Sequence, residues 1–342
     1  MRVLIVAGTL LLLGAGLALA GYDPVLALGA MWHGALGSPD AIASATLVRA
    51  TPLIILGLAF ALALRAGALN IGAEGQFYAG AIAAAWIGVH AADWPSPVAI
   101  AAMWLAAFAA GMLWVLVPVI LRARFGVFEV ISTLLLNFVA EALVSLMVQG
   151  PMQERTGIYP QSDPIAAAAR LPLLPGTRLH LGFALAVALA LAFAWYFART
   201  LSGFRLRAVG LGPRAAEITG RINVRRTASA ALLASGGIAA LAGAAEVGGV
   251  SYALYANLSP GYGFTAIAVA LLARLNPAGI ILTGILFGAL EAGAAGMQRD
   301  AGVPAVIVYV VEAVVIIALL LLDVSSRRRA ALRAPAAAPA AA

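Results

Sequence analysis

Cysteine and lysine are both absent from this 342-residue chain, and charged residues make up only 10% of it. Without cysteine there are no disulfides, thiolate metal sites or cysteine nucleophiles. The three histidines, His33, His90 and His180, are far apart and lack the spacing of metal ligands, so we expect no metal. Without lysine, the standard phosphate-binding loop G-x-x-x-x-G-K-[ST] cannot occur. Because no Ser/His/Asp arrangement is found either, we expect neither an enzyme nor a cofactor.

Hydrophobic residues, in contrast, make up 63% of the chain. Soluble domains are roughly 45–50% apolar and about 25% charged. A chain with so little polar surface cannot cover a water-soluble core, and the lipid bilayer is the solvent that fits it. The composition therefore predicts an all-α integral membrane protein.

A membrane-spanning helix needs about 20 mostly apolar residues, and the chain contains about ten such runs. The shortest run, 263–273, is either a half-span or extends back through Gly261. The first run is read as an uncleaved helix, although its small residues before Gly21 also fit a signal-peptide cleavage site. The predicted spans are 3–21, 41–64, 74–92, 97–121, 130–149, 181–198, 227–247, 263–273, 278–296 and 304–323.

Arginine sets the orientation of these spans. With the N-terminus inside, 16 of the 21 basic residues fall in inside loops and four in outside loops, while Arg49 lies within a span. This bias follows the positive-inside rule and predicts that both termini are cytoplasmic. We therefore expect a transmembrane domain at 1–326, with an outside loop at 150–180 that contains five prolines, and a basic, then Ala/Pro-rich disordered cytoplasmic tail at 327–342.

The inside loop at 199–226 carries seven arginines. Pro213 suits the first turn of a helix, and Gly220 suits its C-terminal cap, so a short helix of about two turns is predicted between them. The loop is either a basic segment that fixes topology beside anionic lipid, or a rigid docking element for a motor subunit. The candidate docking residues are Arg207, Gly210, Pro213, Arg214, Ala215, Ala216, Glu217 and Gly220.

Four segments together resemble a known family. Residues 70–76 read N-I-G-A-E-G-Q, residues 129–137 read E-V-I-S-T-L-L-L-N, and residues 259–272 begin S-P-G-Y-G-F. Residues 214–220 resemble a degenerate coupling motif, with Arg214 where the general motif has Glu. From about 41 to 323, the chain resembles the permeases of ABC importers for nucleosides and simple sugars, which are related to ribose and branched-chain amino acid permeases.

The resemblance implies a permease subunit in the bacterial inner membrane, with ATP hydrolysis in a separate chain. It implies two cytosolic ABC ATPase subunits, a second permease that is either a copy or a paralogue, and an extracytoplasmic substrate-binding protein. Purine nucleosides such as guanosine are the expected cargo, and a ribose-type sugar is the alternative. A secondary transporter that works alone remains a further reading, because scattered intramembrane carboxylates can serve as ion sites.

Polar residues within the apolar runs are candidates for the translocation path or a brace beside it. Asn70, Glu74 and Gln76 fit either this reading or an ordinary cytoplasmic turn. Asn137 and Glu141 share a helical face with Ser145, as pore lining or as helix–helix contacts. Tyr262 and Phe264 suit stacking on a base or sugar, or an interfacial aromatic belt. For Glu246 and Glu291 we expect outer span ends and interfacial water.

Overall fold

The computed structural model describes residues 2–218 and 222–304, together with six helical residues between 307 and 318. Within these residues the secondary structure is helical, and no β-strand is present. Two isolated β-bridges, Gln161 with Tyr255 and Leu173 with His180, occur in loops. The predicted all-α class is therefore confirmed for the described part of the chain.

The chain divides into two compact units, one of residues 38–289 and one that joins residues 1–37 to residues 290–342. The larger unit holds most of the helices, and α13 continues from it into the smaller unit. Its elements are α3 (Pro39–Ala41), the π-turn η1 (Ile42–Thr46), α4 (Leu47–Arg65), α5 (Ala73–Val89), α6 (Ser96–Phe125), α7 (Glu129–Val148), the 3-10 turn η2 (Ala167–Ala169), α8 (Leu181–Arg199), α9 (Leu201–Leu211), α10 (Pro213–Ile218), α11 (Val224–Glu246), the π-turn η3 (Val247–Ser251), α12 (Tyr262–Leu272) and α13 (Pro277–Asp300).

Six helices among the described residues are long and apolar enough to cross a bilayer, and a bent pair in the smaller unit makes a possible seventh. The six are 39–65, 96–125, 129–148, 181–199, 224–251 and 277–300. Helix α5 has 17 residues and α12 has 11, so α12 is the half-length helix that the sequence suggested. The predicted span 304–323 lies largely outside the described residues. The count of ten and the cytoplasmic termini stay predictions.

Helices α4 and α11 form the centre of the larger unit. Of their most apolar stretches, 83% and 78% are buried, against 28% for α6 and α7 and 22% for α8. Helix α11 packs on α4, α5 and α6, and α12 packs on α4. The outer helices therefore turn most of their apolar side chains outward, as expected of a surface that faces lipid.

Small residues let the central helices approach closely. A Cβ atom on Gly80 of α5 would lie 2.1 Å from the carbonyl oxygen of Ala240 on α11. A Cβ on Gly243 of α11 would be just as close to the Phe77 carbonyl oxygen of α5, and one on Gly111 of α6 would lie 2.2 Å from the Gly236 carbonyl oxygen. Membrane helices associate through such small-residue faces because lipid supplies no hydrophobic driving force between them.

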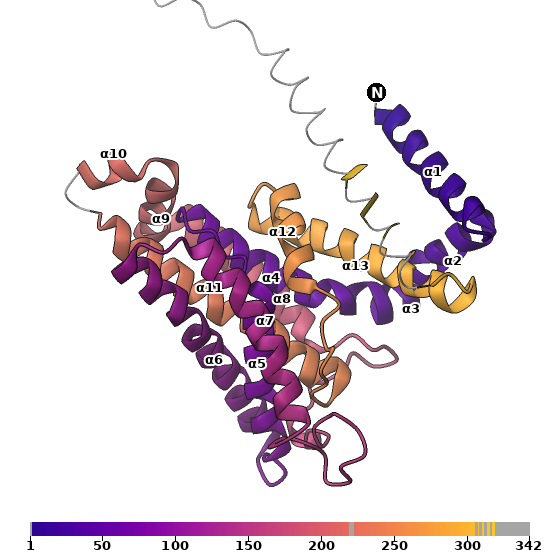
Figure 1. Cartoon of the computed structure of the whole chain (residues 1–342), viewed down its shortest axis with the longest axis horizontal. Coiled ribbons are helices and arrows are strands. Elements are labelled where there is room, and N and C mark those ends of the chain that lie inside the picture. Colours follow the sequence, from indigo (N-terminus) through magenta and orange to yellow (C-terminus); the bar gives the residue numbers. More distant parts are fainter. Residues whose placement is uncertain are drawn as a thin grey trace, which may run out of the picture. The chain divides into compact units, whose positions relative to one another are not determined.

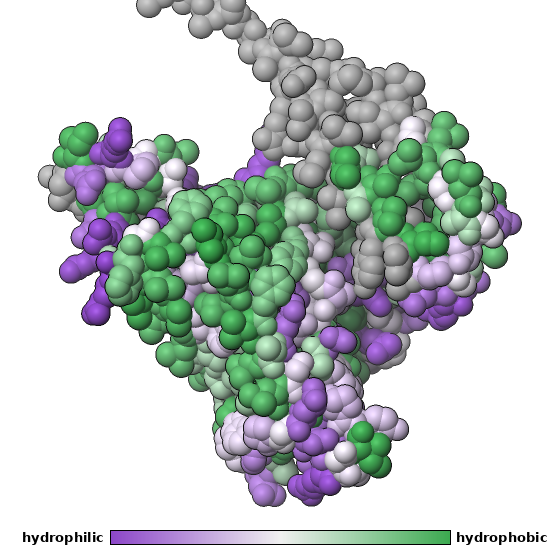
Figure 2. Space-filling model, in the orientation of Figure 1, coloured by the Kyte–Doolittle hydropathy of each residue, from purple (hydrophilic) through white to green (hydrophobic). Residues whose placement is uncertain are grey.

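The two ends of the larger unit differ. Figure 1 shows α9 and α10 at one end of this unit and the loop between α7 and α8 at the opposite end. On the face seen in Figure 2, hydrophobic side chains cover the middle of the unit, and hydrophilic ones gather at these two ends. A band of this kind matches a bilayer between two aqueous phases.

The smaller unit contains α1 (Arg2–Leu19) and α2 (Pro24–Leu36), which are bent by 119° at the turn between them. Asp23 caps α2 by accepting hydrogen bonds from the backbone N–H groups of Val25 and Leu26. Helix α2 packs on the end of α13, where Gly34 lies against Gly296. The sequence analysis placed no helix here, because 13 apolar residues are too few for a span. The predicted tail 327–342 lies outside the described residues.

Candidate functional site

A buried amide pair lies at the start of α5. Asn70 Nδ2 donates to Gln76 Oε1 at 2.9 Å, and Gln76 Nε2 donates back to Asn70 Oδ1 at 2.9 Å. Asn70 Nδ2 also donates to Ser235 Oγ on α11 at 2.9 Å, and Ser235 Oγ donates to the Ala59 carbonyl of α4 at 2.7 Å. Both amide side chains are almost fully buried. The pair therefore ties α4, α5 and α11 together.

Asn137 joins α7 to the same segment. Its Nδ2 donates to the Ile71 carbonyl at 3.0 Å, and its Oδ1 accepts from the Gly75 N–H at 2.8 Å. Asn137 is fully buried, whereas Glu141, one turn further along α7, is exposed. The predicted polar stripe is thus divided, with Asn137 buried in the bundle and Glu141 exposed at its surface.

Glu74 reaches in the other direction, to the start of α12. Its Oε2 accepts a 2.6 Å hydrogen bond from the Gly263 N–H, and the Ser259 side chain adds another hydrogen bond. Gly263 is required here, because a Cβ on it would lie 2.3 Å from the Glu74 nitrogen. The hydroxyl of Tyr78 is 3.4 Å from the Ser259 nitrogen. Glu74 therefore bridges α5 and the half-length helix α12.

The two predicted aromatic residues point differently. Tyr262 is buried, with its ring edge-on to Phe77 at 6.1 Å between centroids, while Phe264 is 43% exposed. Of the seven residues predicted for the path or brace, five are therefore buried within the unit. Glu141 and Phe264 are the two that reach its surface.

An ion pair joins α6 to α7 at the end of the unit that carries α9. Arg122 Nη1 of α6 lies 3.0 Å from Glu129 Oε1 of α7. The same oxygen accepts a 3.3 Å hydrogen bond from the Leu69 N–H, next to the amide pair. Glu129 is buried, so the N-terminal carboxylate of α7 is fixed between a cation and a backbone donor.

The short helix predicted between Pro213 and Gly220 is present as α10, which begins at Pro213 and ends at Ile218. Arg214, Ala215 and Glu217 are exposed and Ala216 is buried, while Gly220 lies outside the described residues. A second helix, α9, precedes it and was not predicted, since its hydropathy is low and its arginines obscure the pattern. The stretch 201–218 therefore forms two successive helices rather than a loop with one helix.

Helix α9 packs on the turn that leads to the amide pair. A Cβ on Gly210 would lie 2.1 Å from the Arg65 carbonyl oxygen, and Gly210 is 3.7 Å from the Cβ position of Gly67. The Arg65 guanidinium sits over the Phe197 ring of α8, 4.4 Å from its centroid. Arg207 lies close to Arg65, with its Nε buried. Only two residues separate Gly67 from Asn70, so α9 and the amide pair contact the same short segment.

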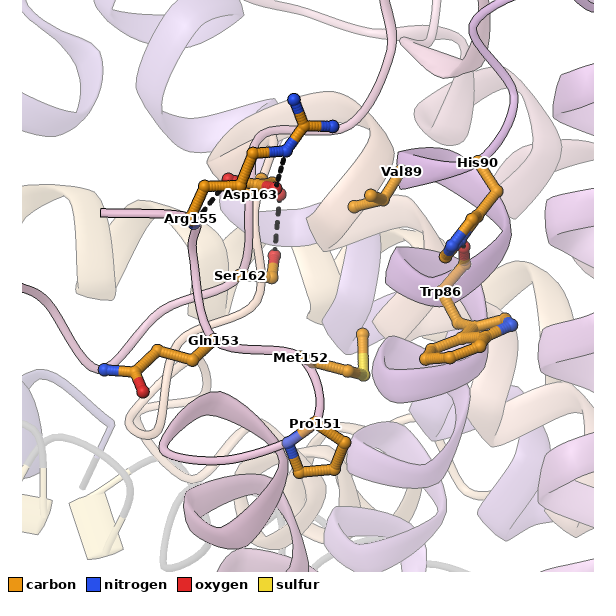
Figure 3. A pocket seen from close by; sticks show the side chains of 9 residues that line it. All are labelled: Trp86, Val89, His90, Pro151, Met152, Gln153, Arg155, Ser162 and Asp163. Carbon is orange, nitrogen blue, oxygen red and sulfur yellow. Dashed lines mark hydrogen bonds and ion pairs between the residues drawn. The ribbon is translucent and has the colours of Figure 1, made fainter. Parts of the chain in front are cut away.

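The opposite end is covered by the loop 149–180. Its Ala166 N–H donates to the Gly88 carbonyl at 2.9 Å, and its Leu171 N–H donates to the Gly248 carbonyl at 2.8 Å. A cleft of about 270 Å³ lies between this loop and the end of α5. Figure 3 shows Trp86 and His90 on its helical side and Arg155 with Asp163 on its loop side.

Two side chains of this loop have shifted pKa values. Hydrogen bonds from Thr156 and Gln161 lower the pKa of Glu154. Burial lowers the pKa of His180 to about 4. The His180 ring accepts a hydrogen bond from the Gly182 N–H at its Nδ1, while its buried Nε2 has no partner. His180 is therefore neutral at physiological pH.

The prediction that interfacial water surrounds Glu246 is wrong. Glu246 is only 8% exposed, because the α7–α8 loop packs over η3 directly after it. Arg49, the arginine predicted within a span, is close enough to Glu246 to act on it electrostatically. Ser235 is a further residue that the sequence analysis missed, and its only signal is a hydroxyl in a helix of Ala, Gly and Leu.

These features define a polytopic helical membrane protein with a buried polar network and two short successive helices, α9 and α10, at one end. The model of the family described as "Branched-chain amino acid transport system / permease component" matches residues 42–320. The chain belongs to this family.

Curated relatives match over most of their length. The glucose ABC transporter permease protein TsgB13 of Haloferax volcanii is 39% identical, over 91% of this chain and 84% of its own. The guanosine ABC transporter permease protein NupP of Bacillus subtilis is 36% identical, over 90% and 87%. The nucleoside ABC transporter permease protein NupB of Lactococcus lactis is 34% identical, over 88% and 85%. In the same three organisms, a second permease is similar at 28–29% identity.

Proposed function

We propose that this chain is the permease subunit of an ATP-driven importer and that a cytosolic ATPase subunit docks on α10. Leu211 and Ile218 lie on either side of the exposed Arg214 and are themselves 91% and 86% exposed. Large apolar side chains at the polar end of a membrane protein gain free energy when a partner covers them. In this arrangement, α9 and α10 face the cytosol of a bacterial cell membrane, and both termini are cytoplasmic.

The contact between Gly210 and Arg65 supports this proposal most directly. Because α9 touches the backbone at the end of α4, a push on α10 passes to the turn 66–72 without an intervening flexible side chain. The turn contains Asn70, whose amide joins α4, α5 and α11. ATP binding in the motor would thus reach the helices that surround the path through one continuous chain of contacts.

A role in the path itself is proposed for Glu141 and Phe264. A carboxylate on a membrane-spanning helix is expensive unless it faces water or protein, and Glu141 is exposed on this subunit. We place both residues at the face where a second permease and the solute meet. The buried residues Asn70, Glu74 and Gln76 then act as a brace behind this face.

The proposed cargo is a small polar solute, a purine nucleoside such as guanosine, with a sugar as the second candidate. Guanosine and nucleoside permeases are among the relatives, and a glucose permease is similarly close. The second permease found in each of three organisms favours pairing with a paralogue over pairing with a second copy. An extracytoplasmic binding protein is expected to dock on the loop 149–180.

Uptake by the reconstituted complex tests this function. The permease, reconstituted with the ATPase, second permease and binding protein that the proposal requires, should import radiolabelled guanosine only with ATP. Unlabelled guanosine, ribose, glucose and leucine are added in competition. Import that proceeds without ATP and without a co-purifying ATPase would favour a secondary transporter instead.

A variant of the docking helix tests the motor contact separately. Ile218→Glu is expected to reduce the amount of ATPase that co-purifies with the permease, because it places a charge in an apolar contact. Leu174→Glu is the matched control, since Leu174 is 55% exposed in the loop at the opposite end. An equal loss of ATPase in both variants would contradict docking on α10.

A further inference from the structure

A second cleft, of about 500 Å³, lies between α8, α9 and α11 at the end of the unit that carries α10. Tyr196, Ser202, Arg205 and Thr227 bring polar groups to it, from the end of α8, from α9 and from the first turn of α11. The rest of its lining is apolar and includes Phe193, Ala234 and Ile238. None of these residues belongs to the amide pair or to α10.

The length of this cleft along α11 matches one leaflet of a bilayer's hydrocarbon core. From Thr227 to Ile238, α11 advances by about 16 Å at 1.5 Å per residue. Half of a hydrocarbon core is about 15 Å thick. With Thr227 at the level of the headgroups, the apolar wall would extend along an acyl chain.

The charge at the polar end is positive. Arg205 is exposed, no acidic side chain lines the cleft, and no ion pair among the described residues involves Arg205. Ser202 in the first turn of α9 and Thr227 in the first turn of α11 both line the cleft, so the positive dipole ends of the two helices lie beside it. A single bound group with negative charge would satisfy this end of the cleft.

We propose that this cleft binds one anionic phospholipid, with its phosphate at Arg205 and an acyl chain between α8 and α11. A water-soluble anion fits the polar end but would leave the apolar wall without a partner. A nucleoside or sugar has polar edges that a wall of alanine, leucine and phenylalanine cannot pair. Only an amphiphile with a negative headgroup matches both parts of the lining.

The position of the lipid gives it a role. It would fill the space between α11 and α9, which carries Gly210 and precedes α10. A bound lipid would then stabilise the packing of α9 and α10 against the bundle. The anionic lipid content of the membrane would therefore change the stability of this packing. The binding itself requires no ATPase and stands independently of the proposed transport function.

Lipid binding to the purified full-length permease, alone or in its complex, tests the proposal. Native mass spectrometry and thermal unfolding in detergent are compared with added phosphatidylglycerol, phosphatidylcholine or inorganic phosphate. We expect one tightly retained phosphatidylglycerol and a stabilisation that phosphatidylcholine does not reproduce. Equal effects of the two lipids would overturn the proposal, as would full stabilisation by inorganic phosphate alone.

Two variants locate the site. Arg205→Gln should weaken phosphatidylglycerol binding by roughly fivefold, as expected for one basic residue at an anionic surface. Ala234→Phe should displace the lipid by filling the apolar part. The controls Arg199→Gln and Ala192→Phe change exposed residues outside the cleft and should bind lipid normally. Undiminished binding in Arg205→Gln, or a second copy of the chain in place of lipid, would refute the assignment.

Discussion

The side chains of Asn70 and Gln76 hydrogen-bond to each other in both directions, at 2.9 Å each, inside a protein with few charges. Asn70 Nδ2 also donates to Ser235 Oγ on α11, 165 residues further along the chain. The arrangement leaves the amide oxygens and nitrogens with partners in a region that water does not reach. The first prediction follows from the number of bonds that meet at Asn70.

Asn70→Ala should destabilise the protein by about 2 kcal/mol. A single polar contact between membrane helices contributes only about 0.6 kcal/mol. Asn70, however, makes four hydrogen bonds, and its removal leaves buried groups of Gln76 and Gly72 unsatisfied. Thermal unfolding in detergent measures the effect, with the exposed Asn257→Ala as control. Equal melting temperatures for the two variants would mean that the pair adds no stability.

Gly80→Ala should be destabilising by about 1–3 kcal/mol, because the new Cβ meets the Ala240 carbonyl at 2.1 Å and pushes α5 away from α11. The matched control, Gly29→Ala, should change stability in the opposite direction. Gly29 in α2 has no atom within 4 Å of an added Cβ, so Gly29→Ala should stabilise slightly through helix propensity. The same unfolding measurement applies to both, and a harmless Gly80→Ala would show that these helices are not closely packed.

Gly210→Ala should impair transport more than it impairs stability. The added methyl group forces α9 away from the Arg65 carbonyl, while Gly212→Ala, two residues later, has its nearest neighbour at 3.7 Å. If α9 transmits the motion of the motor, uptake should fall roughly tenfold in Gly210→Ala and stay near normal in Gly212→Ala. ATPase co-purification should remain intact in both. Normal uptake in Gly210→Ala would remove this contact from the coupling mechanism.

Asn137→Ala and Glu141→Gln, two variants of the polar stripe on α7, should differ in their effects on stability and on uptake. Asn137 bonds to Ile71 and Gly75, so its loss should lower the melting temperature. Glu141 is exposed, so Glu141→Gln should leave the melting temperature unchanged and reduce uptake. A Glu141→Gln protein that transports normally would place the carboxylate away from the solute.

Hydropathy predicted several of the long apolar helices. The runs 97–121, 130–149 and 181–198 lie within a few residues of α6, α7 and α8. The same signal missed α2, which is too short for a span, and α9, in which two arginines interrupt the apolar residues. A long apolar run is enough to predict a membrane-spanning helix, but hydropathy alone does not distinguish a short helix from a loop.

The partners of the polar residues could not be predicted. The sequence marked Asn70, Glu74 and Asn137 as unusual, because such groups within apolar runs need partners. Ser235 and Gly263, which bond to two of them, look like ordinary small residues of a membrane helix. Their role depends on which helices pack together, and a single sequence does not contain that information.

The stability of the protein should depend on pH through His180. Burial lowers the pKa of His180 to about 4, from about 6.5 in the unfolded chain. Between these values the unfolded chain binds a proton at this residue and the folded protein does not, so stability is full above pH 6.5 and falls towards pH 4. The loss should approach about 3 kcal/mol. His180→Gln should flatten this part of the stability profile, and His90→Gln, at an exposed histidine, should leave it unchanged. If His180→Gln loses stability with acid as steeply as the parent protein, His180 is not the group that titrates.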